Sequence, residues 1–222
     1  MLPFQPARGS LRTLEDTGRL VAYSLTAARR YTDRFERIRR RRDLLLAAEI
    51  QWELLPVLAY DTAEFAIAGN LEPAYEIAGD TFDYAVGRDR LTVTITDAIG
   101  HGLRAALLGG LAVTTMRNQR RAGADIIEQA DEASAQLEKQ FGEESYATGF
   151  LVQLDPATGT GIAVNAGHPP PLLLRAGHVR SLRVPPDIPL GIFPGTHYRP
   201  HRISMRTGDR LLFYSDGHHR GH

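Results

Sequence analysis

The segment 92–102, TVTITDAIGHG, constrains the fold more than any other part of the sequence. In its first half Val93 and Ile95 alternate with threonines, which is the period of a half-buried β-strand. A single carboxylate, Asp97, ends this strand. A glycine-rich turn then leads directly into an apolar helical pattern over residues 102–121. The sequence therefore predicts a strand, a tight turn and a helix, with an acid at the end of the strand.

The other periodic segments give the fold class. Short segments rich in β-branched or aromatic residues precede the first helix, and a second helical pattern, with a capping box at Asp125 and Glu128, follows it. Strand patterns then return around a PATG hairpin turn and after a Pro-rich loop. This order indicates an α+β fold rather than alternating βαβ units. The predicted strands are 64–69, 75–86, 90–97, 146–155, 160–167, 170–175, 178–184 and 209–217.

Residues 1–56 are interpreted as a helical segment or linker, and residues 57–222 as the main domain. Hydrophobic side chains recur every seven positions in the first part, at Tyr31, Ile38, Leu45 and Trp52. This stripe predicts either a short coiled coil, and hence a homodimer, or a helix that packs on the next domain. The run ERIRRRRDLL is interpreted as a solvated helix face, because no aromatic interleaving supports nucleic-acid binding.

The composition excludes several classes of protein. The chain has no cysteine, so it has no disulfide framework, zinc–thiolate site or cysteine nucleophile, and any metal must be held by oxygen or imidazole. No apolar run approaches the roughly 20 residues that a membrane-spanning helix needs. The first residues lack the apolar core of a signal peptide, which favours a cytoplasmic protein.

Three segments place carboxylates beside glycine at or near strand ends. They are AGDTFD with Asp80 and Asp83, TDAIGHG with Asp97, and YSDG with Asp216. Taken singly, each aspartate also fits a turn residue. Carboxylates that meet at one sheet edge repel one another unless a cation lies between them. Because an all-oxygen ligand set suits hard ions, the pattern as a whole predicts a Mg²⁺ or Mn²⁺ site.

The segments AGDTFDY, DAIGHGLRAALL, NAGHPPPLLL and GDRLLFYSDG carry a family resemblance. In this order they resemble the motifs of bacterial PPM-type (PP2C-like) serine/threonine protein phosphatases of the SpoIIE-like branch, over about residues 51–217. The resemblance implies a four-layer α-β-β-α sandwich of two antiparallel sheets flanked by helices. It also implies hydrolysis of phosphoserine or phosphothreonine on a regulatory protein, by analogy a STAS-type anti-anti-sigma factor.

The same resemblance implies a binuclear Mn²⁺ or Mg²⁺ centre. Asp80 matches the first metal-binding acid and Asp97 the bridging acid, so both are assigned to catalysis. The backbone carbonyl of Ala98 completes a ligand set, and Asp216 matches the acid of the last motif. Two such ions lower the pKa of a bound water, and the hydroxide formed attacks phosphorus without a covalent enzyme intermediate.

Five further residues are candidates for substrate contact or for support of the metal ligands. Asp83 either orients a metal-bound water or is a turn residue. Asn165 and His168 match a motif near the site, although a histidine between glycine and proline also fits a structural role. Gly100 and His101 lie in the turn after Asp97, and His101 is not assigned as a ligand because oxygen ligation predominates in this family.

The sequence departs from the family pattern after Asp216. The family continues with further elements and another metal-binding acid, whereas this sequence ends at HHRGH. We therefore expect part of the domain to be missing at this end. This departure supports an alternative function, in which the chain is a catalytically impaired pseudophosphatase that binds a partner as a regulatory module.

Overall fold

The computed structural model describes residues 46–71, 79–142 and 144–215. The helices in these ranges are α3 (Leu46–Leu54), α4 (Gly102–Arg121) and α5 (Ile126–Phe141). The strands are β1 (Ala59–Asp61), β2 (Ala66–Ala68), β3 (Thr81–Val86), β4 (Leu91–Ala98), β5 (Ala147–Leu154), β6 (Thr160–Ala166), β7 (Leu172–Arg175), β8 (His178–Ser181), β9 (His201–Ser204) and β10 (Arg210–Leu212).

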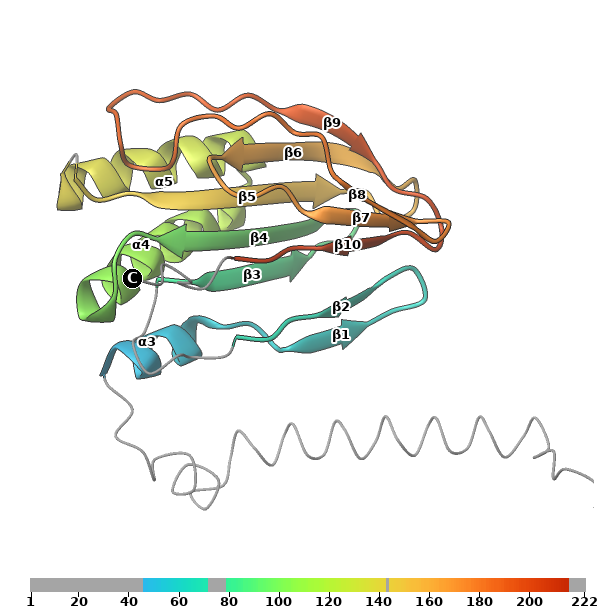
Figure 1. Ribbon diagram of the computed structural model, residues 1–222, viewed down its shortest axis with the longest axis horizontal. Helices are drawn as coiled ribbons and strands as arrows, with labels where there is room; N and C mark the ends of the chain where they lie inside the picture. The colour runs from blue at the N-terminus through green and yellow to red at the C-terminus, as the bar shows by residue number, and fades with distance from the viewer. Residues whose placement is uncertain (1–45, 72–78, 143, 216–222) are drawn as a thin grey trace, which may run out of the picture. The chain divides into compact units, whose positions relative to one another are not determined.

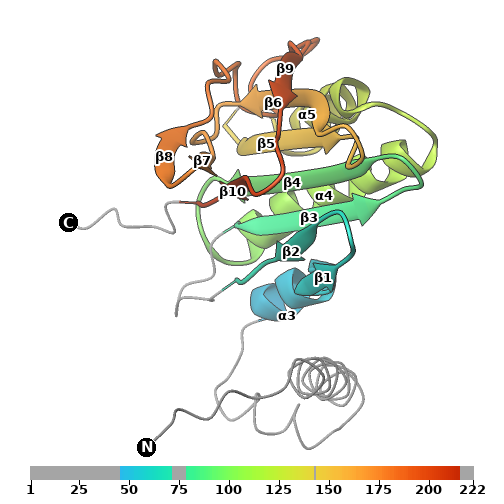
Figure 2. The same ribbon diagram turned by 90° about the vertical axis from the view of Figure 1, so that its right-hand side faces the viewer.

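The strands form three antiparallel sheets. Five of them pair in the order β3-β4-β5-β6-β9, three in the order β10-β7-β8, and β1 pairs with β2. Helices α4 and α5 cover one face of the five-stranded sheet, the three-stranded sheet lies at its other face, and the β1–β2 hairpin lies beside the β3 edge (Figures 1 and 2). The predicted α+β sandwich with antiparallel sheets is therefore confirmed, and the described residues supply three of its four layers.

Two hydrophobic cores fill the spaces between these layers. The core between α4, α5 and the five-stranded sheet includes Leu108, Met116, Ile126, Leu137, Leu151 and Val164. The core between the five-stranded and three-stranded sheets includes Phe150, Val152, Ala163, Val184 and Ile203, with Phe213 packed against it. Successive side chains of each central strand point to opposite faces of the sheet. One set of alternate residues therefore packs in the helix-covered core and the other set in the core between the sheets.

Strand β4, which ends in the predicted turn before α4, shows this alternation. Thr92, Thr94 and Thr96 are nearly fully buried. Val93 and Ile95 are half-buried and face the three-stranded sheet. The predicted strand is confirmed, but its more buried face is the threonine face, because two long helices cover that side of the sheet.

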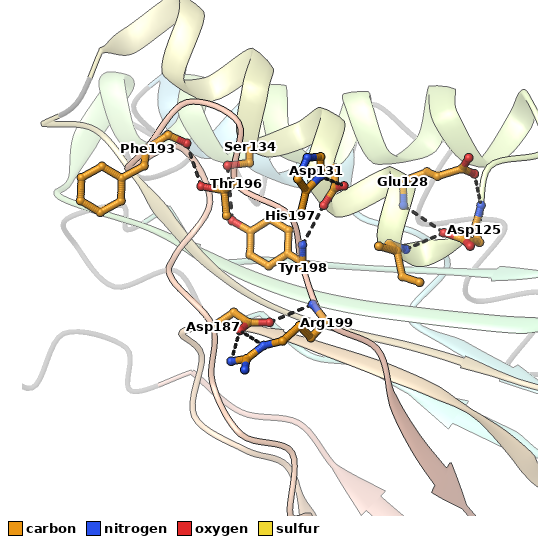
Figure 3. Close-up of polar contacts among 11 residues, drawn as sticks. Asp125, Glu128, Asp131, Ser134, Asp187, Phe193, Thr196, His197, Tyr198 and Arg199 are labelled. Atoms are coloured by element: carbon orange, nitrogen blue, oxygen red, sulfur yellow. Dashed lines mark hydrogen bonds and ion pairs between the residues drawn. The ribbon is translucent and has the colours of Figure 1, made fainter.

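The segment after the Pro-rich loop is fixed to α5 by polar contacts (Figure 3). Asp131 accepts a hydrogen bond from the Tyr198 backbone N–H at 2.9 Å and pairs with His197 at 2.8 Å. The Tyr198 hydroxyl donates to Ser134, and burial of this phenol raises its pKa to about 12. The predicted capping box of α5 is confirmed by the reciprocal bonds of Asp125 and Glu128.

Helix α3 lies against α4 in the compact unit that contains every described residue. Its Ala48 is fully buried, whereas Trp52 is half-buried. The other residues of the seven-residue stripe lie outside the described ranges, and the division of the chain at residue 56 stays a prediction. Within the described ranges, none of the helices combines the length and the apolar character that crossing a bilayer requires.

Sequence patterns missed two strands, β1 and β9. Strand β1 has only three residues, all of them exposed, so it carries no alternation of buried and exposed positions. Strand β9 is short and follows the Pro-rich loop, with only Ile203 buried. Both strands form through pairing with a partner strand rather than through a strong local pattern.

Candidate functional site

Asp80 and Asp97 lie at the same end of the β3–β4 pair. Thr81 of β3 is the cross-strand partner of Thr96 of β4. The Ala98 N–H donates to the Gly79 carbonyl at 3.3 Å, so the pairing continues past the start of β3. One step along this register, Asp80 faces Asp97, and side chains so paired have Cβ atoms about 5 Å apart. Both carboxylates lie on the face of the sheet that meets the three-stranded sheet.

Glycine brings the backbone around Asp80 into close contact with β4. A Cβ atom at Gly79 would lie 2.3 Å from the Ala98 Cβ and 2.7 Å from the Ala98 carbonyl oxygen. A Cβ at Gly109 of α4 would lie 2.8 Å from the Gly79 carbonyl oxygen. The absence of side chains at both positions therefore lets α4, β4 and the Asp80 segment pack together.

Helix α3 holds the Asp80 backbone from the other side. The Gln51 side chain is 5% exposed, and its Nε2 donates to the Asp80 carbonyl at 2.9 Å. Sequence analysis assigned no role to this glutamine. The surrounding sequence, residues 49–56, reads EIQWELLP, and nothing in that pattern shows which side chain reaches the site.

Hydrogen bonds through His168 link Thr148, which lies beside Asp97, to the segment after β10. Thr148 of β5 is the cross-strand partner of Asp97. Its hydroxyl lies 2.7 Å from Nδ1 of His168, and Nε2 of His168 lies 3.1 Å from the Tyr214 carbonyl oxygen. Because a carbonyl can only accept, Nε2 carries the hydrogen, and in the neutral imidazole Nδ1 then accepts from the Thr148 hydroxyl. His168 thus fixes the chain two residues before Asp216, which lies outside the described residues.

Asn165 holds the turn that presents His168. Its Oδ1 accepts from the His168 backbone N–H at 2.8 Å, and its Nδ2 donates to the Val184 carbonyl at 3.2 Å. Both side chains are almost completely buried. These contacts give the NAGH segment a positioning role between β6 and the C-terminal strand.

The turn after Asp97 needs glycine at two positions. Gly100 has a φ of +87° and Gly102 a φ of +74°, a region that side chains other than glycine rarely adopt. Between them His101 is the N-cap of α4, with an exposed side chain that makes no capping hydrogen bond. The predicted strand–turn–helix is confirmed, while contact of Gly100 or His101 with a substrate stays a prediction.

Asp83 requires a correction. It is neither in a turn nor beside Asp97, because it lies within β3 on the face that meets α4. Its carboxylate accepts from Arg117 at 2.7 Å and from Arg120 at 3.0 Å. Asp83 therefore anchors α4 to the sheet, with the sheet between it and Asp97, and the two arginines occupy both of its oxygens.

The donor set at this end of the sheet suits a hard cation as far as it is described. Asp80 and Asp97 bring two carboxylates together, and the Ala98 carbonyl lies beside the Asp80 segment. Within the described residues, no group of three or more histidine, aspartate or glutamate side chains forms a metal site. The predicted ligand set is completed only by Asp216, so its assignment stays a proposal.

Comparisons with solved structures identify the fold. A Mycobacterium tuberculosis structure containing RsbU and RsbW domains superposes with a TM-score of 0.58 and 32% identity, over 72% of this chain and 41% of that one. The PP2C phosphatase domain of SpoIIE from Bacillus subtilis gives a TM-score of 0.53 at 20% identity, over 60% of this chain and 40% of that one. The fold is thus that of PP2C-type phosphatase domains.

The sequence comparisons narrow this class to a family. The family described as Stage II sporulation protein E (SpoIIE) matches residues 87–220, and the chain belongs to this family. Phosphoserine phosphatase RsbP of Bacillus subtilis is 27% identical over 184 residues, which cover 80% of this chain and 45% of RsbP. Protein IcfG of Synechocystis is 23% identical, over 80% of this chain and 32% of IcfG. The chain spans less than half the length of these relatives.

Proposed function

We propose that this protein is a metal-dependent protein serine/threonine phosphatase. One observation carries the proposal: Asp80 and Asp97 face each other at the end of paired strands, in a domain of the SpoIIE family. Two adjacent carboxylates repel each other, and a divalent cation between them removes this cost. This arrangement supports metal binding better than it supports a purely structural role for the two acids.

Asp80, Asp97, the Ala98 carbonyl and Asp216 would hold a binuclear Mn²⁺ or Mg²⁺ centre. When bound, such a centre supplies a hydroxide at neutral pH and neutralises charge on the phosphoryl oxygens. The chain's own residues position this donor set. Gln51 holds the Asp80 backbone, and His168 holds the backbone at Tyr214, two residues before Asp216.

The proposed substrate is a phosphorylated regulatory protein of a sigma-factor pathway, by analogy a STAS-type anti-anti-sigma factor in the cytoplasm. RsbP is named a phosphoserine phosphatase, and the Mycobacterium tuberculosis neighbour combines RsbU and RsbW domains. These names support a phosphoprotein substrate. The family resemblance of the four motifs supports the choice of a STAS-type protein.

We expect Mn²⁺-dependent hydrolysis of p-nitrophenyl phosphate and of a serine-phosphorylated STAS protein. Removal of the metal by a chelator should abolish both activities, and re-addition of Mn²⁺ or Mg²⁺ should restore them, because the donor set consists of oxygens. Phosphate release at a series of metal concentrations measures this. Retained binding of the phosphoprotein without any hydrolysis would contradict the enzyme assignment and favour the pseudophosphatase alternative.

We also propose that the helical segment before the domain mediates a homodimer. A variant that starts at Leu46 keeps α3, whose Ala47 and Ala48 are buried in the domain. It lacks the preceding positions of the seven-residue stripe, so we expect it to be monomeric where the full chain is dimeric. Light scattering coupled to size-exclusion chromatography measures the mass of both. If the variant and the full chain contain the same number of chains per particle, this dimer is excluded.

A further inference from the structure

A cationic groove lies at the end of the β7–β8 hairpin. Its volume is about 320 Å³, and it is lined by Arg175, His178, Arg180 and Arg206. The first two residues flank the hairpin turn, and Arg206 comes from the turn between β9 and β10. Among the described residues, no acidic side chain lines this groove.

The one acid behind the groove is already neutralised. Nε of Arg175 donates to both Asp209 oxygens, at 2.9 and 3.0 Å, and this interaction lowers the pKa of the Asp209 carboxyl. The Arg206 backbone N–H also donates to Asp209, at 2.7 Å. Arg180 and Arg206 themselves are exposed and form no ion pair within the described part of the chain. Their two guanidinium groups are therefore available to an anion.

Local charge strengthens this groove. Three arginines and one histidine line it, in a chain of zero formal net charge. An excess of positive charge at one place attracts an acidic ligand and speeds its association.

The groove is separate from the candidate active site. Strand β7 begins at Leu172, which pairs with Leu212, two residues before the Tyr214 carbonyl held by His168. Arg175 lies at the opposite end of β7. In Figure 1 the hairpin and the Asp97 end of β4 are accordingly at opposite ends of the sheets. A ligand in the groove would leave Asp80 and Asp97 uncovered.

Within the described ranges, strand β8 beside the groove has an open edge. It is the outer strand of the β10-β7-β8 sheet, and all four of its residues are exposed. Ala176 and Gly177, both with positive φ, form a two-residue turn, and Leu182 N–H donates to the Pro171 carbonyl. Hydrogen-bonded and non-hydrogen-bonded residue pairs alternate along an antiparallel pair of strands. The bond at Leu182 sets this alternation, so the backbone N–H and C=O groups of Val179 and Ser181 point away from β7.

We propose that this edge and groove bind an extended acidic segment of a partner protein. The segment adds to β8 as a further antiparallel or parallel strand, and its carboxylates pair with Arg180 and Arg206. Backbone hydrogen bonds supply affinity in such strand addition, while side-chain pockets supply specificity. Carboxylates bind guanidinium groups through two parallel hydrogen bonds, which suits this lining. Nucleic acid fits less well, since no phenylalanine, tyrosine or tryptophan lines the groove for base stacking.

The probe for this proposal is a fluorescent peptide of alternating glutamate and valine, with a lysine–valine peptide as its counterpart. We expect the full chain to bind the acidic peptide and not the basic one. Arg180→Glu and Arg206→Glu should each weaken binding about tenfold or more, because each removes a charge-assisted hydrogen-bonded pair. Val179→Pro should abolish binding, since it removes a backbone donor at the open edge while leaving the pairing with β7. Fluorescence anisotropy measures the affinities.

Arg121→Glu is the matched control, because Arg121 is an exposed arginine at the end of α4 with no ion pair in the described residues. This variant should bind the acidic peptide like the unchanged chain. Near-ultraviolet circular dichroism should be the same for all four variants. Peptide binding that Arg180→Glu or Val179→Pro leaves intact would overturn the proposal. Binding of duplex DNA, of phosphatidylserine vesicles or of inorganic phosphate, without binding of the peptide, would also overturn it. None of these measurements requires phosphatase activity.

Discussion

Asp97→Asn is expected to reduce metal-dependent phosphate ester hydrolysis about a hundredfold or more, because metal ions supply several kcal/mol of transition-state stabilisation. Asp97 faces Asp80 across the β3–β4 pair, and asparagine is a neutral residue of the same shape. The substitution therefore removes a charged ligand without creating a cavity. Steady-state hydrolysis of p-nitrophenyl phosphate over a Mn²⁺ titration measures the loss.

Stability measurements separate loss of metal binding from loss of fold. Without metal, Asp97→Asn should be at least as stable as the unchanged chain, because like charges directly opposite on paired strands destabilise a sheet by about 0.2–1 kcal/mol. Added Mn²⁺ should raise the melting temperature of the unchanged chain, since a ligand that binds only the folded state stabilises it. The same addition should shift the variant much less.

Asp89→Asn is the matched control. Asp89 lies in the exposed turn between β3 and β4, at the other end of the same hairpin. It undergoes the same chemical change away from the candidate site, so its turnover and its response to Mn²⁺ should be unchanged. Near-unchanged turnover of Asp97→Asn at added Mn²⁺ would refute the assignment of Asp97 to the metal centre.

Asp83→Ala is expected to destabilise the fold by about 3 kcal/mol, the cost of breaking a buried ion pair from one side. The Asp83 side chain is 4% exposed, and the Arg117 and Arg120 side chains are 21% and 20% exposed. Without the carboxylate, two cations remain largely desolvated at the contact between α4 and β3. Urea unfolding should show a lower midpoint with an unchanged m-value.

Arg199→Ala provides the comparison for this variant. Arg199 also pairs with an aspartate, Asp187, but its side chain is 69% exposed. The Asp187 side chain is 10% exposed, but it keeps the hydrogen bond from the Arg199 backbone N–H, which this substitution leaves in place. Because the guanidinium that is removed is mostly in solvent, its ion pair contributes about 0–1 kcal/mol, and this variant should lose far less stability. Equal losses for the two variants would show that the Asp83 contact does not anchor α4. Folded Asp83→Ala should keep the affinity of the site for Mn²⁺, because its carboxylate lies on the other face of the sheet from Asp97.

Local sequence patterns determined the elements around the candidate site. Alternating β-branched residues specified β4, and glycines on both sides of His101 specified a turn with positive φ. Asp125 and Glu128 specified the start of α5. Each of these sequence patterns depends on residues within a few positions of one another. They can therefore be recognised without knowing which strands pair.

Only the tertiary structure decided which of the acids lie together. Asp80 and Asp83 belong to one short motif, yet successive side chains of a strand point to opposite faces, and three positions separate these two. Asp80 therefore faces Asp97, whereas Asp83 meets the arginines of α4. The register of β3 on β4 and of β5 on β4 also brought Thr148 beside Asp97, and packing of α3 brought Gln51 to the Asp80 backbone. These contacts join residues far apart in the chain, and no local pattern encodes them, because strand register and helix packing are fixed by the whole core.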